Sequence, residues 1–138
     1  MIEVRPLHKA DLFKIKDCLV EQDQHLSYEM ADYAENSGTS FTYVKDDKVV
    51  GCCGAGLVDG VYNVWAVYSR AFSAIIRARC MKAFIKKLRT VFVGKKALIA
   101  VNPALRNVVK FVKFLGGKYV RCEYSPVMGI IYTVYEVA

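Results

Sequence analysis

The order in which strand-like and helix-like segments follow one another constrains the fold of this chain most. Three segments rich in β-branched and aromatic residues come in close succession, at 41–44, 49–57 and 61–67. Asp46-Asp47 makes a tight turn between the first two, and Asp59-Gly60 is a strong hairpin signal because both residues tolerate positive φ. Strands joined by such turns pair antiparallel, so an antiparallel meander is predicted in the middle of the chain.

The C-terminal half alternates between helical and strand patterns. A helix is predicted at 73–89, where the apolar residues form one stripe. A short apolar run at 97–101 indicates a buried strand, and a last helix is predicted at 104–115, ended by Gly116. A strand–helix–strand crossover joins parallel strands, so one mixed sheet is expected to hold both kinds of pairing.

The remaining segments complete the order of elements. Strands are predicted at 2–6, 119–124 and 129–137, and helices at 11–22 and 26–35. The whole order reads β-α-α-β-β-β-α-β-α-β-β, which predicts an α+β fold built on an α/β mixed sheet. A chain of 138 residues has the length of one domain, so residues 1–138 are predicted to form a single domain.

Charge divides the chain sharply. Between Arg70 and Arg121 there are fourteen Lys and Arg residues and no Asp or Glu, whereas residues 1–69 hold six basic and eleven acidic residues. Summed like charge produces a field that steers anions toward it. The basic half is therefore expected to meet the phosphates of a cofactor, a nucleic-acid backbone or an acidic protein face. The alternative is that these basic residues only solvate helix faces.

Cysteine and histidine content argues against a metal centre. The five cysteines are odd in number and include no Cys-x-x-Cys, so they are interpreted as reduced cytosolic thiols that serve as small core residues. His8 and His25 are the only histidines, and neither lies near a cysteine pair, so no metal site is predicted. No secretory signal and no apolar run long enough for a bilayer occur, which predicts a cytoplasmic protein without a membrane partner.

A glycine-rich run at 51–56 has the wrong spacing for a dinucleotide-binding loop and precedes a hairpin rather than a helix. Its glycines are predicted to mark a bulge or a close approach of other groups to the backbone.

Several local sequences, together with the element order, resemble the GCN5-related N-acetyltransferase (GNAT) superfamily. The similarity covers nearly the whole chain, in short motifs: Arg5-Pro6 before Asp11-Leu12, Lys48-Val49-Val50-Gly51, Trp65-Ala66-Val67 and Lys113-Phe114-Leu115-Gly116. By its length and by the run from Gly51 to Gly116, the chain is most similar to small phage-encoded members, including an internal virion protein family of short-tailed phages.

This resemblance implies a site for acetyl-coenzyme A where two parallel strands splay apart. The family places the pyrophosphate on an Arg/Gln-x-x-Gly-x-Gly/Ala loop at a helix N-terminus, where backbone N–H groups favour anions. The matching stretch here, 67–75, has small residues but no glycine. The cofactor-binding residues that the resemblance implies are Ala66, Val67, Arg70, Ser73, Ala74, Asn102 and Asn107.

The resemblance assigns no catalytic residue. Members of the family often use a tyrosine on the last helix to protonate the departing thiolate, and Val112 stands at that position. The nearest acids to the central strand are Asp59 and Glu123, which are interpreted as a turn residue and a strand-edge charge. General acid–base chemistry near neutral pH requires a group with a tunable pKa, and no carboxylate lies between these two residues.

Three hypotheses follow for function. The first is an acetyl-coenzyme A-dependent N-acetyltransferase with weak or lost activity, whose acceptor is an amine-bearing small molecule or protein. The second is a non-catalytic GNAT-like phage virion or host-interaction protein, in the virion or the host cytoplasm, whose basic half binds an acidic protein or DNA. The third is a structural domain whose charges keep it dissolved.

Overall fold

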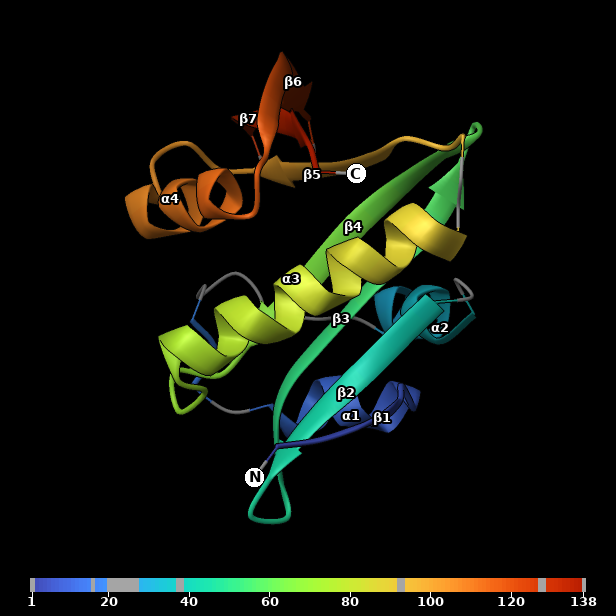
Figure 1. Ribbon diagram of the computed structural model, residues 1–138, viewed down its shortest axis with the longest axis vertical. Coiled ribbons are helices and arrows are strands. Elements are labelled where there is room, and N and C mark those ends of the chain that lie inside the picture. The colour runs from blue at the N-terminus through green and yellow to red at the C-terminus, as the bar shows by residue number, and fades with distance from the viewer. Residues whose placement is uncertain are drawn as a thin grey trace. The chain divides into compact units, whose positions relative to one another are not determined.

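The computed structural model describes residues 2–15, 17–19, 28–36, 39–91, 94–126 and 129–137. Seven strands and four helices occur in the described residues, in the predicted order (Figure 1). Their bounds are β1 Ile2–Pro6, α1 Lys9–Lys14, α2 Tyr28–Asn36, β2 Thr39–Lys45, β3 Lys48–Val58, β4 Val61–Tyr68, α3 Ala74–Val91, β5 Ala97–Val101, α4 Arg106–Phe114, β6 Lys118–Ser125 and β7 Ile130–Glu136.

The strands form one mixed sheet in the order β1-β2-β3-β4-β5-β7-β6. The pairs β1–β2, β2–β3, β5–β7 and β6–β7 run antiparallel, whereas β4 and β5 run parallel. Asp46, Asp47, Asp59 and Gly60 all have positive φ, as two-residue hairpin turns require. The α+β class, the mixed sheet and the order of elements are thus confirmed.

The chain divides into two compact units, each held together by contacts among its own residues. The first comprises Met1–Leu57 and Val64–Ala74, and the second comprises Val58–Asn63 and Ile75–Ala138. Each is described by itself below.

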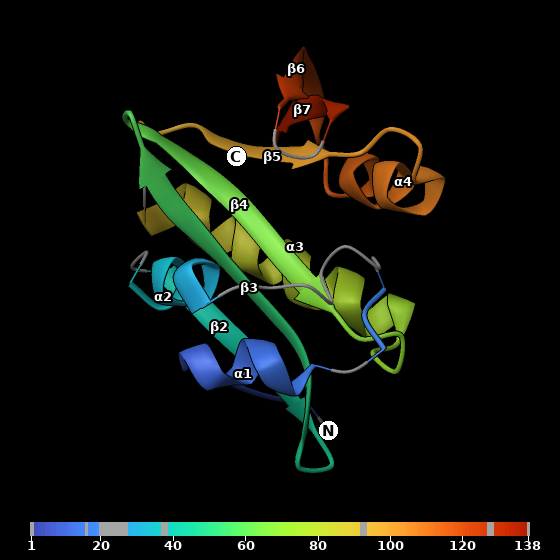
Figure 2. The same ribbon diagram turned by 180° about the vertical axis from the view of Figure 1, so that it is seen from behind.

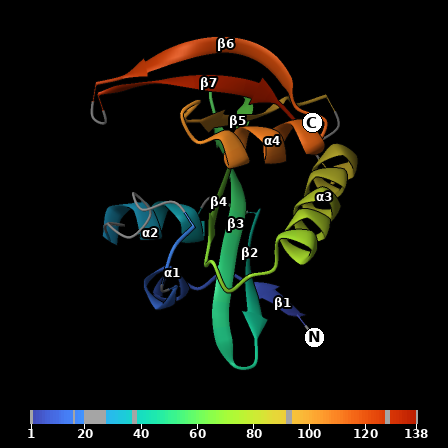
Figure 3. The ribbon, with the colours of Figure 1, turned by 90° about the vertical axis from the view of Figure 1, so that its left-hand side faces the viewer.

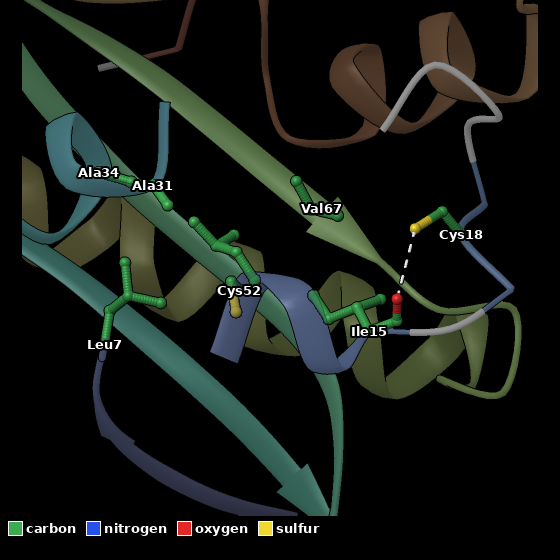
Figure 4. Packing of buried hydrophobic residues seen from close by; sticks show 8 residues of the cluster. Leu7, Ile15, Cys18, Ala31, Ala34, Cys52 and Val67 are labelled. Atoms are coloured by element: carbon green, nitrogen blue, oxygen red, sulfur yellow. Dashed lines mark hydrogen bonds between the residues drawn. The ribbon is translucent and has the colours of Figure 1, made fainter. Parts of the chain in front are cut away.

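The core of the first unit lies between its strands and the helices α1 and α2, which lie side by side on one face of β2 and β3 (Figure 2). Eight buried residues make up this cluster, seven of them labelled in Figure 4: Leu7, Leu12, Ile15, Cys18, Ala31, Ala34, Cys52 and Val67. Burial of apolar side chains on this scale is the main force that holds the helices on the sheet.

A buried carboxylate ties α1 to the strands beneath it. Asp11 accepts two hydrogen bonds from the Arg5 guanidinium, at 2.8 and 2.7 Å, and one from the Thr42 hydroxyl at 2.9 Å. It also accepts one from the His8 backbone N–H at 3.0 Å, which satisfies an N–H at the start of the helix. Burial raises the pKa of Asp11, but these hydrogen bonds outweigh it and leave the pKa below its usual value.

The helix predicted at 11–22 is wrong in its extent. Helix α1 ends at Lys14, because Ile15 is extended and Asp17 has a φ of 53°. Cys18 then forms an isolated antiparallel bridge with Ser69. Long-range pairing with the end of β4 therefore replaces the last turns of the predicted helix; residues 20–22 of that prediction lie outside the described ones.

In the second unit, α4 packs beside β5, β6 and β7 (Figure 3). Its Val112 is fully buried against Gly117. The helix ends as predicted at Gly116, which has a φ of 85° and donates its N–H to the Lys113 carbonyl, while Gly117 donates to the Val112 carbonyl. This pair of hydrogen bonds is the Schellman motif, which requires a residue with left-handed backbone angles after the helix. Cation–π contacts join α3 to α4, with Lys82 Nζ 4.1 Å from the Phe114 ring centre.

All five cysteines are thiols, but they are not all core residues. Cys18, Cys52 and Cys53 are buried as predicted, whereas Cys80 is half-buried and Cys122 is exposed on β6. Among the described helices, none has the length and apolar character that crossing a bilayer requires.

Candidate cofactor site at the turn between β4 and α3

Parallel pairing between β4 and β5 is short. Tyr62 lies opposite Ala97 and Asn63 opposite Leu98, at the N-terminal ends of both strands. The register of the described residues pairs no later residue of β4 with β5. Beyond Asn63 the chain belongs to the first unit, where it leads through Tyr68 into the turn before α3.

That turn is built on the buried Ser69. Its N–H donates to the Val50 carbonyl at 2.9 Å, its hydroxyl accepts from the Ala71 N–H at 3.1 Å, and its carbonyl accepts from the Phe72 N–H at 3.0 Å. Val50 faces Ser69 in the register that the Asp59-Gly60 hairpin sets between β3 and β4, so this bond continues the pairing of those strands. On the other side of β3, a bulge against β2 skips Val50: Tyr43 pairs with Gly51, and Val44 with Val49. The end of the β3–β4 hairpin thus provides the acceptor that fixes the turn.

The buried side chain of Phe72 anchors the turn to the first unit. Its side chain is 1% exposed, and its ring lies 5.6 Å from that of Tyr43 and 5.7 Å from that of Tyr68. A Cβ on Gly51 would lie only 2.8 Å from the Tyr68 ring and 3.3 Å from that of Phe72. Glycine is therefore required in β3 where these rings approach the backbone, which confirms the predicted role of the glycine run.

The segment after α1 covers one side of the same turn. Leu19 donates its N–H to the Tyr68 carbonyl at 2.6 Å, and Arg70 donates to the Asp17 carbonyl at 2.9 Å. The Arg70 guanidinium also lies 3.5 Å from the Asp17 carboxylate, Nε to Oδ1. Arg70 is nevertheless half exposed, so its other nitrogens can contact an anion.

Ala74 is the first residue of α3 and Ser73 directly precedes it, and both are exposed. Within the described residues, no acceptor is present for the backbone N–H groups of these two residues. The first turn of α3 has no acidic residue, so the positive end of the helix dipole is not neutralised there. Small side chains and unpaired N–H groups at the start of a helix, in a turn that also holds Arg70, suit a phosphate group.

Other residues of the predicted site lie elsewhere in the units. Val67 is buried in the core of the first unit, and Ala66 is half-buried beside it on β4. Asn102 and Asn107 belong to the second unit, where the Asn102 side chain accepts from the Ala104 N–H at 3.0 Å in the turn before α4. On α3, the Arg77 guanidinium lies over the Phe111 ring of α4, 5.9 Å from the ring centre.

Groups for proton transfer are scarce among the described residues that sequence reasoning considered. Val112, at the position of the family's tyrosine, is fully buried and apolar. Asp59 occupies the hairpin turn, and Glu123 accepts from the Arg121 guanidinium at 2.7 Å on an exposed strand. Burial raises the pKa of the Cys52 thiol to about 12, which keeps it protonated and excludes it as a nucleophile near neutral pH.

A separate hollow of about 490 Å³ lies in the second unit. Its lining mixes both signs of charge, with Lys96 and Arg121 beside Glu123 and Glu136. Val61 and Asn63, at the N-terminal end of β4, also line it, whereas the turn described above follows the C-terminal end of that strand.

Sequence reasoning missed two parts of this site. The anchoring role of Phe72 had one signal, a single large aromatic residue among small ones at 71–74. The pairing of 17–19 with the end of β4 had none, since Ile15, Cys18 and Leu19 also fit the apolar face of a helix.

Solved structures of GNAT acetyltransferases share this fold over almost the whole chain. An N-acetyltransferase from Staphylococcus aureus Mu50 is 14% identical, with a TM-score of 0.75 over 99% of this chain and 96% of that one. The ribosomal-protein-S18-alanine N-acetyltransferase from Escherichia coli is 13% identical, with a TM-score of 0.73 over 99% and 93%. Ard1 from Thermoplasma volcanium is 15% identical, with a TM-score of 0.72 over 99% and 98%.

No protein-family model and no curated protein sequence matches the chain. Identities this low establish the fold and not the activity. The protein therefore has the GNAT fold.

Proposed function

We propose that this protein is an N-acetyltransferase that takes acetyl-coenzyme A as donor and the amine of a small molecule or protein as acceptor. The GNAT fold supports the class of reaction. The observation that supports acetyl-coenzyme A as the cofactor is the turn before α3. There Ser73 and Ala74 are exposed, with unpaired backbone N–H groups, at the start of an 18-residue helix.

The chemistry requires little of the protein beyond positioning. The amine nitrogen attacks the thioester carbonyl, the C–N bond forms and the C–S bond breaks. The nitrogen then loses a proton to solvent, and the departing thiolate takes up a proton. Because Val112 cannot donate that proton, we propose that solvent supplies it. A positioned general acid typically contributes about 10²–10⁴-fold, so a slow transferase is expected.

Isothermal titration calorimetry with acetyl-coenzyme A tests the cofactor site. Ala74→Asp would place a carboxylate at the N–H groups that we assign to the pyrophosphate, and we expect it to weaken binding by about tenfold or more through like-charge repulsion. An acid in the first turn of a helix does not destabilise the helix itself, so the variant should fold normally.

Ala83→Asp is the matched control, because it adds the same charge at an exposed position farther along α3. It should bind acetyl-coenzyme A like the unaltered protein. Absence of heat for the unaltered protein at millimolar ligand would contradict the proposal, as would equal affinity in the two variants.

A second candidate, binding of a polyanion such as DNA, is favoured by one surface. Exposed basic residues recur on one face of α3 at intervals of three and four: Arg79, Lys82, Lys86 and Arg89. We call this the α3 basic stripe. No acidic residue lies between Arg70 and Arg121 to neutralise it. We propose that, if the transferase activity is lost, this stripe carries the protein's function.

The salt dependence of duplex DNA binding tests this candidate. If the four residues of the α3 basic stripe each neutralise one phosphate, log K should fall against log[salt] with a slope of about −3 to −4. Replacing two of them, Arg79→Glu with Lys86→Glu, should reduce that slope by about 2. Lys48→Glu, at an exposed position outside the basic half, should leave it unchanged. A weak interaction that salt does not affect would exclude the candidate.

A further inference from the structure

Strand β6 lies at one edge of the sheet, and most of its residues are exposed to solvent. It pairs with β7 on one side only, and seven of its eight residues, Lys118 to Tyr124, are exposed. A strand in this position presents a row of backbone N–H and C=O groups that can pair with another strand.

Large exposed apolar and aromatic side chains lie on β6 and on the neighbouring strand β7. Tyr119 and Tyr124 are 63% and 62% exposed, and Ile131, which lies opposite Tyr124 on β7, is 58% exposed. Three large exposed side chains on two neighbouring strands form a patch of the kind that protein partners cover.

We propose that β6 pairs antiparallel with β6 of a second copy of this chain, with Cys122 at the two-fold axis. A two-fold axis places every residue opposite one on the same face of the joint sheet. Centred on Cys122, it brings Arg121 of each copy opposite Glu123 of the other. These two residues already share a face and form an ion pair within one chain, so the dimer has four alternating charges.

Charge also selects this register over its neighbours. Moving the axis to Arg121 would place two guanidinium groups opposite each other, and moving it to Glu123 would do the same for two carboxylates. Like charges directly opposite one another destabilise a strand pair. The strand is therefore complementary to itself in one register only, which is why a second copy is the partner that fits it.

The dimer is expected to be weak. In the register centred on Cys122, Tyr124 and Ser125 face Val120 and Tyr119 of the other copy, where the register shift between Tyr119 and Arg121 lies, so regular pairing is limited to Arg121, Cys122 and Glu123. A net charge of +7 on each copy also opposes association. An interface of this size lies at the low end for specific contacts, so the dissociation constant should be on the order of tens of micromolar.

Oxidative cross-linking detects such a dimer directly. With copper–phenanthroline and air as the oxidant, two Cys122 thiols lose two protons and two electrons and form an intermolecular disulfide. A dimer band should appear on a non-reducing gel for the unaltered protein and for Cys80→Ser, and should disappear for Cys122→Ser. Cross-linking that persists in Cys122→Ser, or none in the unaltered protein, would overturn the proposal.

Charge variants test the register in solution by analytical ultracentrifugation. Arg121→Glu and Glu123→Arg should each be monomeric, because each brings like charges together across the axis. An equimolar mixture of the two should dimerise, because an acidic β6 then meets a basic one. Both positions are exposed, and circular dichroism should show unaltered folding. A mixture that stays monomeric, or single variants that dimerise like the unaltered protein, would refute this register.

Discussion

Replacing Phe72 by Ala should lower the free energy of unfolding by about 3–5 kcal/mol, the usual cost of removing a fully buried aromatic ring. The ring packs against those of Tyr43 and Tyr68 and lies close to Gly51 of β3. Urea unfolding monitored by circular dichroism measures the loss, which should lower the midpoint at unchanged slope.

Phe114→Ala is the control for this prediction. It removes the same kind of ring at a position that is 56% exposed, where Lys82 Nζ lies 4.1 Å from the ring centre. Its cost should be about 0.5–1 kcal/mol. If both variants lose the same stability, Phe72 does not anchor the turn. Acetyl-coenzyme A should also bind more weakly to the folded fraction of Phe72→Ala, because the turn that presents Ser73 and Ala74 loses its support.

Replacing Asp11 by Asn should cost about 3 kcal/mol at neutral pH, since it removes the charge that pairs with Arg5 in a buried site. The amide has two donors, so it cannot accept all four of the hydrogen bonds that the carboxylate receives. Chemical unfolding at pH 7 measures the effect. Glu3→Gln, an exposed acid on β1, should change stability by about 0.5 kcal/mol or less.

The same residue predicts how stability depends on pH. The pKa of Asp11 is lower in the folded protein than in the unfolded chain, so its contribution is present above the unfolded pKa of about 3.9. It is lost as pH falls through the lower, folded pKa. The difference in stability between the unaltered protein and Asp11→Asn should therefore shrink when pH falls from 5 toward 2. A difference that is constant with pH would show that the charge is not what stabilises α1.

Local chemistry was sufficient to predict most elements of this fold. Asp59-Gly60 and Gly116 adopt the positive φ angles that their residue types favour, so the hairpin and the end of α4 were predictable from a few neighbouring residues. The basic helix at 73–89 is also observed, as Ala74–Val91. Its apolar stripe has the helical period and no competing pattern.

Features set by distant contacts were not predictable in this way. The end of α1 at Lys14 depends on hydrogen bonds between Asp17 or Leu19 and the end of β4, some fifty residues later. The exposure of Cys122 follows from the position of β6 at the edge of the sheet, which strand order alone decides.

The site itself was only partly accessible to sequence reasoning. The resemblance to the GNAT superfamily located the turn at 67–75, and the structure supplies what makes that turn suitable for an anion: exposed N–H groups at Ser73 and Ala74. The acceptor amine has no comparable marker, because specificity for it depends on side chains brought together from separate parts of the chain.

An amide NMR spectrum of the protein, titrated with coenzyme A, tests the cofactor site most directly. We predict that the backbone N–H resonances of Ser73 and Ala74 shift first and farthest, with a saturating dependence on ligand concentration. Unchanged resonances at these two residues at millimolar coenzyme A, or shifts confined to β6 and β7, would contradict a phosphate-binding turn at the start of α3.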